Sequence, residues 1–384
     1  MLTWEEIIDA EEPGERTEYG KLSSGIVLYR QARSLIAMLP DMNFRTLSTA
    51  YFNGGFIDSP DAVVNTSSFG GIVEEKMMPN PISLHNECTS IHYRKMGLDP
   101  KNVVGLATAA NMDNASISHR PGNIDVSCAM TGGIRGNGGR AGDPAWFDES
   151  ESDRISHGTI MIILAIDSEL SDGAMIDAVS IATEAKSCVI QELHGRSLYS
   201  PNIATGSGTD QVVVISRIGN TKTEKIERGS ELSVQISECV KTALYETFDR
   251  QSGMTLKTQM NGLIALNRVG ITQKMIHNEI RLSSTMDNLI KAENEIYADV
   301  TFSSQIYSML AVHDAVVNGH ISQLDALDFT YRFCKNVILN GIKLENVMDL
   351  RLKRSDTIPL MLSLATALKI REKATELGGS NYVR

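Results

Sequence analysis

The stretch ATGSGTD at residues 204–210, followed by the apolar run at residues 211–218, is the most informative part of this chain. The apolar run predicts a buried strand, and the seven residues before it are small and mostly polar. Glycines at 206 and 208 allow positive φ and a close approach of the backbone to a ligand. A loop of this kind is most often only a turn. Its hydroxyls and the Asp210 carboxylate also fit a ligand-binding loop.

A second glycine-rich loop strengthens the binding interpretation. It reads TGGIRGNGGRAGDP at residues 131–144, follows an apolar run at residues 124–130, and ends with Arg140 and Asp143. Ligands of sheet proteins tend to bind beyond strand ends. The two loops therefore predict one shared pocket bordered by Asp143 and Asp210.

Four segments, taken in order, resemble the adenosylcobinamide amidohydrolases of cobalamin salvage. They are residues 131–143, GTIMIIL at 158–164, ATEAK at 182–186 and ATGSGTD at 204–210. The likeness extends from about residue 20 to about residue 248, where SELSVQISECVKTALYETF is similar to the helix that closes the family's domain. Two positions depart from the family's pattern: Asn111 stands where an aspartate is frequent, and Ser207 where a threonine is usual.

The resemblance implies an enzyme that cleaves the aminopropanol amide of adenosylcobinamide and releases adenosylcobyric acid. The corrinoid is then the substrate, and no cofactor is required. Two alternatives remain open. One is a protein that holds a corrinoid or a phosphorylated ligand without turnover, and the other is a hydrolase of a different amide.

Amide hydrolysis needs an attacking group, donors for the developing oxyanion and an acid for the departing amine. The acid and base candidates are Asp210, Asp143, Glu184 and His157, the last because an imidazole pKa lies near neutrality. Candidate substrate-binding positions of the same segments are Asn137, Arg140, Lys186, Thr131, Thr205, Gly206, Gly208 and Thr209. The three threonines are also candidate nucleophiles, a role that requires an activating base nearby.

A metal site is the main competing idea. His85, Cys88 and His92 recur at three- and four-residue steps, which on a helix places them on one face. Histidine and cysteine are zinc ligands, but a dedicated site usually has three or four ligands with further hydrogen-bond support. The segment also fits a plain amphipathic helix, and we expect no metal here.

Composition predicts a cytoplasmic protein that binds neither nucleic acid nor membrane. The 384 residues carry a formal net charge of −11, whereas phosphate binding needs a basic surface. The five cysteines are odd in number and form no C-x-x-C pair, which is typical of a reducing compartment. The acidic N-terminal residues lack a signal-peptide pattern. No apolar run approaches the ~20 residues that span a bilayer.

The texture of the sequence changes near residue 250. Residues 1–250 alternate apolar runs with loops rich in glycine, serine, threonine and asparagine, and they contain one clear helix at residues 172–193, capped by Ser171 or Asp172. They predict an α+β domain with a mixed sheet layered with helices. The expected strands are residues 46–52, 63–64, 103–106, 124–130, 159–166 and 212–218.

Residues 251–384 predict an all-helical C-terminal module. Glycine is sparse, and apolar residues recur at helical spacing over residues 255–269, 271–280, 288–317 and 358–377. The module holds no glycine-rich binding loop. Its expected work is packing, homo-oligomerisation or covering the pocket.

Overall fold

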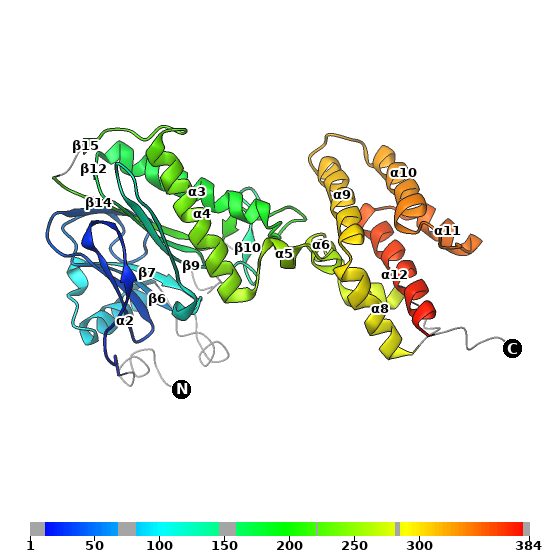
Figure 1. Ribbon diagram of the computed structural model, residues 1–384, viewed down its shortest axis with the longest axis horizontal. Coiled ribbons are helices and arrows are strands. Elements are labelled where there is room, and N and C mark those ends of the chain that lie inside the picture. Colours follow the sequence, from blue (N-terminus) through cyan, green and yellow to red (C-terminus); the bar gives the residue numbers. More distant parts are fainter. Residues whose placement is uncertain (1–11, 68–81, 146–158, 220–221, 281–284, 379–384) are drawn as a thin grey trace. The chain divides into compact units, whose positions relative to one another are not determined.

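The computed structural model describes residues 12–67, 82–145, 159–219, 222–280 and 285–378, without the side chains of residues 82–85. The chain divides into two compact units, Met1–Thr255 and Leu256–Arg384. Sheets and helices build the first unit, and the described part of the second is helical (Figure 1). The predicted fold class, an α+β domain followed by an all-helical region, is confirmed.

Two large sheets form the body of the first unit. The five-stranded sheet has the order β1 (Thr17–Lys21), β2 (Val27–Gln31), β3 (Ser34–Met38), β6 (Ala62–Ser67), β7 (Val103–Thr108). The six-stranded sheet has the order β5 (Gly55–Asp58), β4 (Phe44–Ser48), β14 (Gln211–Arg217), β11 (Met161–Ile166), β9 (Val126–Thr131), β8 (Ser116–Arg120). Within these two sheets β6 pairs parallel with β7 and β11 with β14, and the other pairs are antiparallel.

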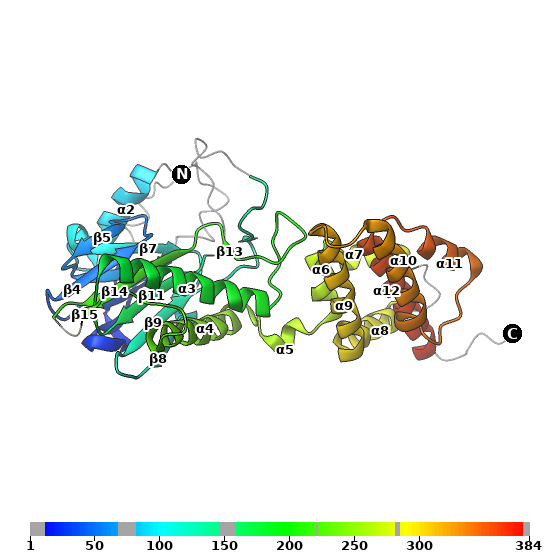
Figure 2. The same cartoon turned by 90° about the horizontal axis from the view of Figure 1, so that it is seen from above.

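Three apolar layers stack these elements in the order helix, sheet, sheet, helix. The helices are α2 (Ile82–Lys95), α3 (Asp172–Glu192) and α4 (Glu231–Ser252). Leu106 and Ile163 belong to the core between the two sheets. Ala178 and Val240 belong to the core beneath α3 and α4, and Tyr93 of α2 packs on the five-stranded sheet. Figure 2 shows α2 on one side of the sheets and α3 and α4 on the other.

Helix α3 follows from its sequence almost residue by residue. Ser171 caps its start, because the hydroxyl of Ser171 accepts a hydrogen bond from Ala174 N at 3.2 Å. Four buried alanines at residues 174, 178, 182 and 185 let the helix lie close to the sheet. The helix ends at Glu192, one residue before the predicted end.

The six predicted strands are all present, with their bounds shifted by a few residues. Among the strands of the two large sheets, those that the sequence did not predict are β1, β2, β3, β5 and β8. Their residues are often polar or only partly buried, as in β1 and β5, so a continuous apolar run does not mark them. The structure accordingly has two large sheets, whereas the sequence predicted a single sheet.

The second unit contains α5 (Leu256–Gln259), α6 (Gly262–Arg268), α7 (Gln273–Glu279), α8 (Met286–Ala298), α9 (Val300–Val317), α10 (Gln323–Phe333), a π-helical turn (Cys334–Ile338), α11 (Asn346–Lys353) and α12 (Ile358–Leu377). The predicted helix at residues 288–317 is two helices, because Asp299 ends α8 and caps α9 by accepting from Phe302 N at 2.8 Å. Helices α10 and α11 lie outside the predicted segments. Across the described residues, no helix is long and apolar enough to cross a membrane.

Candidate active site

The two glycine-rich loops meet at one end of the strands of the six-stranded sheet. β9 ends at Thr131, opposite Met161 at the start of the antiparallel β11. β14 runs parallel to β11 and begins beside it at Gln211. The loop after β9 and the loop before β14 therefore leave the sheet at the same end of its strands. They then pair with each other, because β10 (Gly138–Gly139) and β13 (Gly206–Ser207) form a two-stranded sheet.

Asp210 accepts four hydrogen bonds at this end of the strands. Its Oδ2 accepts from Lys186 Nζ at 2.5 Å and from Ser207 N at 3.0 Å. Its Oδ1 accepts from Ser207 Oγ at 2.5 Å and from Ile160 N at 3.0 Å. The side chains of Lys186 and Asp210 are 9% and 11% exposed. Since a carboxylate offers about four lone-pair sites, Asp210 is fully engaged in joining α3, the 204–210 loop and the start of β11.

Gly206 is required by this ion pair. A Cβ at residue 206 would lie 2.4 Å from Asp210 Oδ2 and 2.7 Å from Lys186 Nζ. Both distances are far below a van der Waals contact, so a side chain would displace the pair. The glycine that the sequence assigned to ligand binding thus makes room for protein groups. Gly208 lies exposed in the same loop.

Thr205 connects the two loops to α3. Its Oγ1 accepts from Ala141 N at 3.0 Å, and its main-chain N donates to Gly139 O at 2.8 Å. Its carbonyl accepts from Ser187 Oγ at 2.9 Å. The hydroxyl that the sequence offered as a nucleophile therefore supports the first loop.

Asp143 closes the first loop. Its Oδ2 accepts from Arg140 N at 2.7 Å and from Ser197 Oγ at 2.5 Å, and Arg140 Nη1 donates to Ile203 O at 3.0 Å. Partial burial raises the pKa of Asp143, but hydrogen bonds from Ser197, Ser200 and Arg140 N, with the Arg140 charge, outweigh it and leave the pKa below its ordinary value. Asp143 is ionised at neutral pH and fits a base or an acceptor better than an acid.

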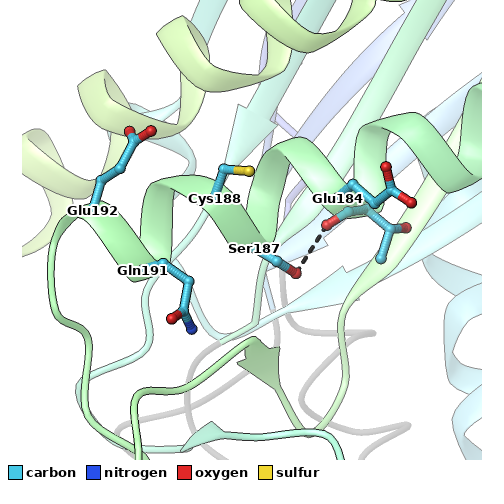
Figure 3. A pocket seen from close by; sticks show the side chains of 6 residues that line it. Glu184, Ser187, Cys188, Gln191 and Glu192 are labelled. Atoms are coloured by element: carbon cyan, nitrogen blue, oxygen red, sulfur yellow. Dashed lines mark hydrogen bonds between the residues drawn. The ribbon is translucent and has the colours of Figure 1, made fainter. Parts of the chain in front are cut away.

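Glu184 faces away from the ion pair of Lys186, because residues two apart on a helix point in different directions. It is exposed and binds Arg228, whose Nε donates to Glu184 Oε2 at 2.8 Å. The hydrogen bond and charge of Arg228 lower the pKa of Glu184. A shallow hollow of about 510 Å³ follows this face of α3 (Figure 3) and is lined by Thr183, Glu184, Ser187, Cys188, Gln191 and Glu192. Asp143 and Asp210 do not line it, so their shared pocket stays a prediction.

Further polar side chains lie at or near this end of the strands, and several of them are buried. Thr131 is fully buried, and its Oγ1 accepts from Asn65 Nδ2 at 2.9 Å. Thr209 Oγ1 lies 2.7 Å from Thr159 Oγ1. Asn137 is 1% exposed. Sequence reasoning missed Asn65, although an asparagine directly after the buried run of β6 was the available signal.

His85, Cys88 and His92, the residues considered as metal ligands, lie on α2, and the sequence predicted a helix for this segment. Cys88 and His92 are both 4% exposed, and His92 Nε2 lies 2.9 Å from Ser34 Oγ. The side chain of His85 is outside the described residues, and so is the whole of His157. Among the described side chains, no group of three or more His, Cys, Asp or Glu could hold a metal.

The two departures from the family's pattern have simple structural roles. Ser207 donates to Asp210 through its hydroxyl, a contact that threonine can also make. Asn111 caps a short 3₁₀ turn, Met112–Asn114, by accepting from Asp113 N at 3.0 Å. Aspartate caps turns and helices in the same way.

The two paired loops form a candidate site at one end of the strands of the six-stranded sheet, and comparison with known proteins gives the class of the protein. Residues 20–256 match the model of the adenosylcobinamide amidohydrolases. That span is more than half of the chain, and the chain belongs to this family. Its activity is hydrolysis of the amide of adenosylcobinamide in cobinamide salvage.

Two further proteins are similar to parts of the chain. The uncharacterized protein MJ1613 of Methanocaldococcus jannaschii is 31% identical over 172 residues, which are 41% of this chain and 67% of that protein. The crystal structure of the PH0078 protein from Pyrococcus horikoshii aligns with a TM-score of 0.26 and 15% identity, over 61% of this chain and 81% of that one.

Proposed function

We propose that the hydrolysis takes place at the end of the six-stranded sheet where loops 131–144 and 204–210 pair. The observation that supports this place is the set of donors around Asp210. Lys186 comes from ATEAK, Ile160 from GTIMIIL and Ser207 from ATGSGTD. The remaining family segment, residues 131–143, lies at the same end of the sheet because its strand β10 pairs with β13. Segments far apart in the sequence thus converge on one carboxylate.

Asp210 acts here as a positioning residue rather than as the acid or base that its motif suggests. Both of its oxygens are already engaged twice, and its partner Lys186 is buried. Fixing a loop in this way holds neighbouring groups in the geometry that the transition state needs, and displacement by about 1 Å can cost a hundredfold in rate.

Asp143 is the proposed water-holding group, because its carboxylate accepts hydrogen bonds while its lowered pKa makes it a weak base. The departing amine needs a donor that still carries a proton near neutrality, and the lowered pKa of Glu184 excludes that carboxyl from the role. His157 is the proposed acid, since an imidazole titrates in this range. It stands two residues before Thr159, which contacts Thr209 of the second loop.

The remaining candidates bind the substrate or support the loops in this proposal. Thr209 and the main-chain N–H groups of the two loops donate to the amide carbonyl as its charge develops, whereas Thr131 is fully buried and supports the loop that follows it. Arg140 binds another carbonyl group of the corrinoid, and Asn137, which is 1% exposed, supports the first loop from within. No cofactor takes part, and the corrinoid enters as substrate alone. Prolonged dialysis against a chelator should leave turnover unchanged. Activity that disappears and returns with zinc would contradict this.

The decisive experiment is incubation of the purified chain with adenosylcobinamide, followed by mass spectrometry. We expect adenosylcobyric acid and free aminopropanol. Saturable corrinoid binding without product would favour the alternative of a binding protein. Release of an amine only from other amides would favour altered specificity.

The second unit is the proposed surface for homo-oligomerisation. Fifteen of the twenty-two large apolar side chains that are exposed in the described chain lie at or after residue 256. Such side chains are commonly covered in an assembly. The cytoplasm is the proposed location, because the five cysteines form no disulfide among the described residues. Nucleic acid is not an expected partner of so acidic a chain.

A further inference from the structure

The hollow on α3 borders the second glycine-rich loop. The described side chains that line it come from one face of the helix (Figure 3). Two of them bind the loop directly: Ser187 Oγ donates to Thr205 O at 2.9 Å, and Gln191 Nε2 donates to Ala204 O at 2.9 Å. The hollow is therefore open to solvent and lies next to the proposed reaction site.

The two hydroxyls of the hollow are arranged as acceptors. Thr183 Oγ1 donates to Val179 O at 2.8 Å, and Ser187 Oγ lies 3.0 Å from Thr183 O and 2.9 Å from Thr205 O. A hydroxyl has one proton and two lone pairs. Because each proton is directed at a main-chain carbonyl, both oxygens have only lone pairs to offer a ligand.

Gln191 also presents an acceptor, because its amide orientation is fixed. Ala204 O can only accept, so the NH₂ group of Gln191 must face it. Gln191 Oε1 then points away from the loop, and no described residue donates to it. Cys188 lies beside Gln191 in the lining, and its exposed thiol is only a weak donor.

Two carboxylates complete the lining. Glu184 binds Arg228, and Glu192 accepts from Lys241 Nζ at 2.6 Å and from the hydroxyl of Tyr245. Partial burial raises the pKa of Glu192, but these hydrogen bonds and the Lys241 charge outweigh it and leave the pKa below its ordinary value. Both carboxylates are ionised at neutral pH and keep lone pairs for a further donor.

A hollow lined with acceptors fits a ligand that is rich in donors and carries no negative charge. A corrin has primary carboxamides around its rim, and their NH₂ groups are such donors. Carboxylates at the same positions would meet Glu184 and Glu192 as like charges, which disfavours binding. The volume of about 510 Å³ lies within the range of about 300–1,000 Å³ for ligand pockets. Because the hollow is shallow, it holds one edge of the corrin.

We propose that the hollow on α3 is a specificity subsite that binds the carboxamide-bearing edge of the corrin. The inference rests on the proposed function, in which the scissile amide lies at loops 131–144 and 204–210. The edge bound here is remote from the bond that breaks, and its contacts are the same in the ground state and the transition state. Such binding sets KM and the choice of substrate, and it leaves kcat largely unchanged.

Protection of Cys188 from a thiol reagent tests this occupancy. Cys188 is exposed, and the other four cysteines are buried, so N-ethylmaleimide should alkylate Cys188 first. Adenosylcobyric acid keeps the rim carboxamides and is not hydrolysed. At ten times its Kd it should slow the alkylation by about tenfold, since about a tenth of the sites stay empty. Adenosylcobyrinic acid, whose rim groups are carboxylates, should slow it by less than about twofold at the same concentration.

Cys188→Trp fills the hollow and gives the kinetic test. We expect the KM for adenosylcobinamide to rise by about tenfold or more, with kcat lowered by less than about threefold. Ile176→Trp is the matched control, because Ile176 is 57% exposed on the same helix and does not line the hollow. Its KM should stay within about twofold of the wild type. Both variants should keep the wild-type Tm, since both positions are exposed.

Failure of the inference is distinguishable from failure of the proposed function. If the wild type hydrolyses adenosylcobinamide but adenosylcobyric acid does not protect Cys188, only the inference is overturned. An equal KM in Cys188→Trp and Ile176→Trp, or equal protection by the two acids, overturns it as well. If the wild type makes no adenosylcobyric acid while that acid protects Cys188, the proposed function falls and the hollow remains a corrinoid-binding site.

Discussion

The two units of this chain use buried polar groups differently. In the first unit the 204–210 loop, α3 and the start of β11 are tied together through Asp210. In the second unit buried charges join pairs of helices, as when Arg268 of α6 binds Asp314 of α9 at 2.9 and 3.0 Å. Glu293 of α8 likewise lies 2.5 Å from His277 of α7. Polar groups collected at one end of a sheet are typical of a reaction site, whereas ion pairs distributed between helices stabilise the packing of those helices.

The family match divides the chain at almost the same place. It covers residues 20–256, and all four family segments lie in the first unit. The second unit supplies most of the exposed large apolar side chains instead. The comparison therefore predicts that damage to the first unit removes turnover, and that damage to the second changes stability or assembly and leaves turnover intact.

The largest effect is expected when the ion pair of the first unit is broken. Asp210→Asn should lower turnover by about a hundredfold, because the loop loses its anchor. It should also lower the free energy of unfolding by about 3 kcal/mol, because Lys186 is left buried without its counter-charge. Steady-state kinetics and urea unfolding measure the two effects. Near-normal turnover in Asp210→Asn would remove this residue from the mechanism.

A double variant separates the two losses. Lys186→Met with Asp210→Leu replaces the pair by apolar side chains of similar size, which often restores stability. Turnover should stay low, because neither side chain can hold the Ser207 and Ile160 amides. Recovery of turnover together with stability would show that the pair serves folding alone.

Gly206→Ala should give a smaller loss at the same place. The added Cβ meets Asp210 and Lys186, and relief of such overpacking costs about 1–3 kcal/mol. We expect turnover to fall by about tenfold, on the assumption that part of the loop geometry survives. Gly173→Ala is the control, because its Cβ would have no neighbour nearer than 3.8 Å and it lies in the first turn of α3. Equal losses in both variants would contradict the role given to Gly206.

Much of the fold could be predicted from the sequence, because its signals are local. The start of α3 follows from Ser171 and a regular apolar stripe, and β11 and β14 follow from uninterrupted apolar runs. The site could be predicted only in part. Its segments were identified, but the ion pair joins residues 24 apart in the sequence, and the bond from Asn65 to Thr131 joins residues 66 apart. Spacing along the chain carries no signal for such contacts.

Asp314→Asn tests the second unit. Hydrogen bonds and charges from His313 and Arg268 outweigh the effect of partial burial and lower the pKa of Asp314. A carboxyl with a lowered folded pKa adds stability above its unfolded pKa of about 4, and that stability is lost as the pH falls through the folded value. At pH 7 the variant should lose about 2 kcal/mol of unfolding free energy.

The same variant should show a flatter loss of stability below about pH 4 than the wild type, since it lacks the group that titrates there. Turnover of the folded variant should match the wild type. A drop in kcat at full occupancy of the folded state would mean that the second unit takes part in the chemistry, against the comparison on which this prediction rests.

The smallest effect on turnover is expected from removing the second unit altogether. A chain ending at Thr255 retains every proposed catalytic and binding residue, so kcat should stay within about threefold of the full chain. Its apparent mass in light scattering should be that of a monomer, whereas the full chain should assemble through the exposed apolar side chains of its helices. If the shortened chain is folded and binds corrinoid normally but does not hydrolyse it, then a helix beyond residue 255 supplies a reacting group. That result would also move the boundary between chemistry and support, because the family segments of the first unit would then bind the substrate without completing the site.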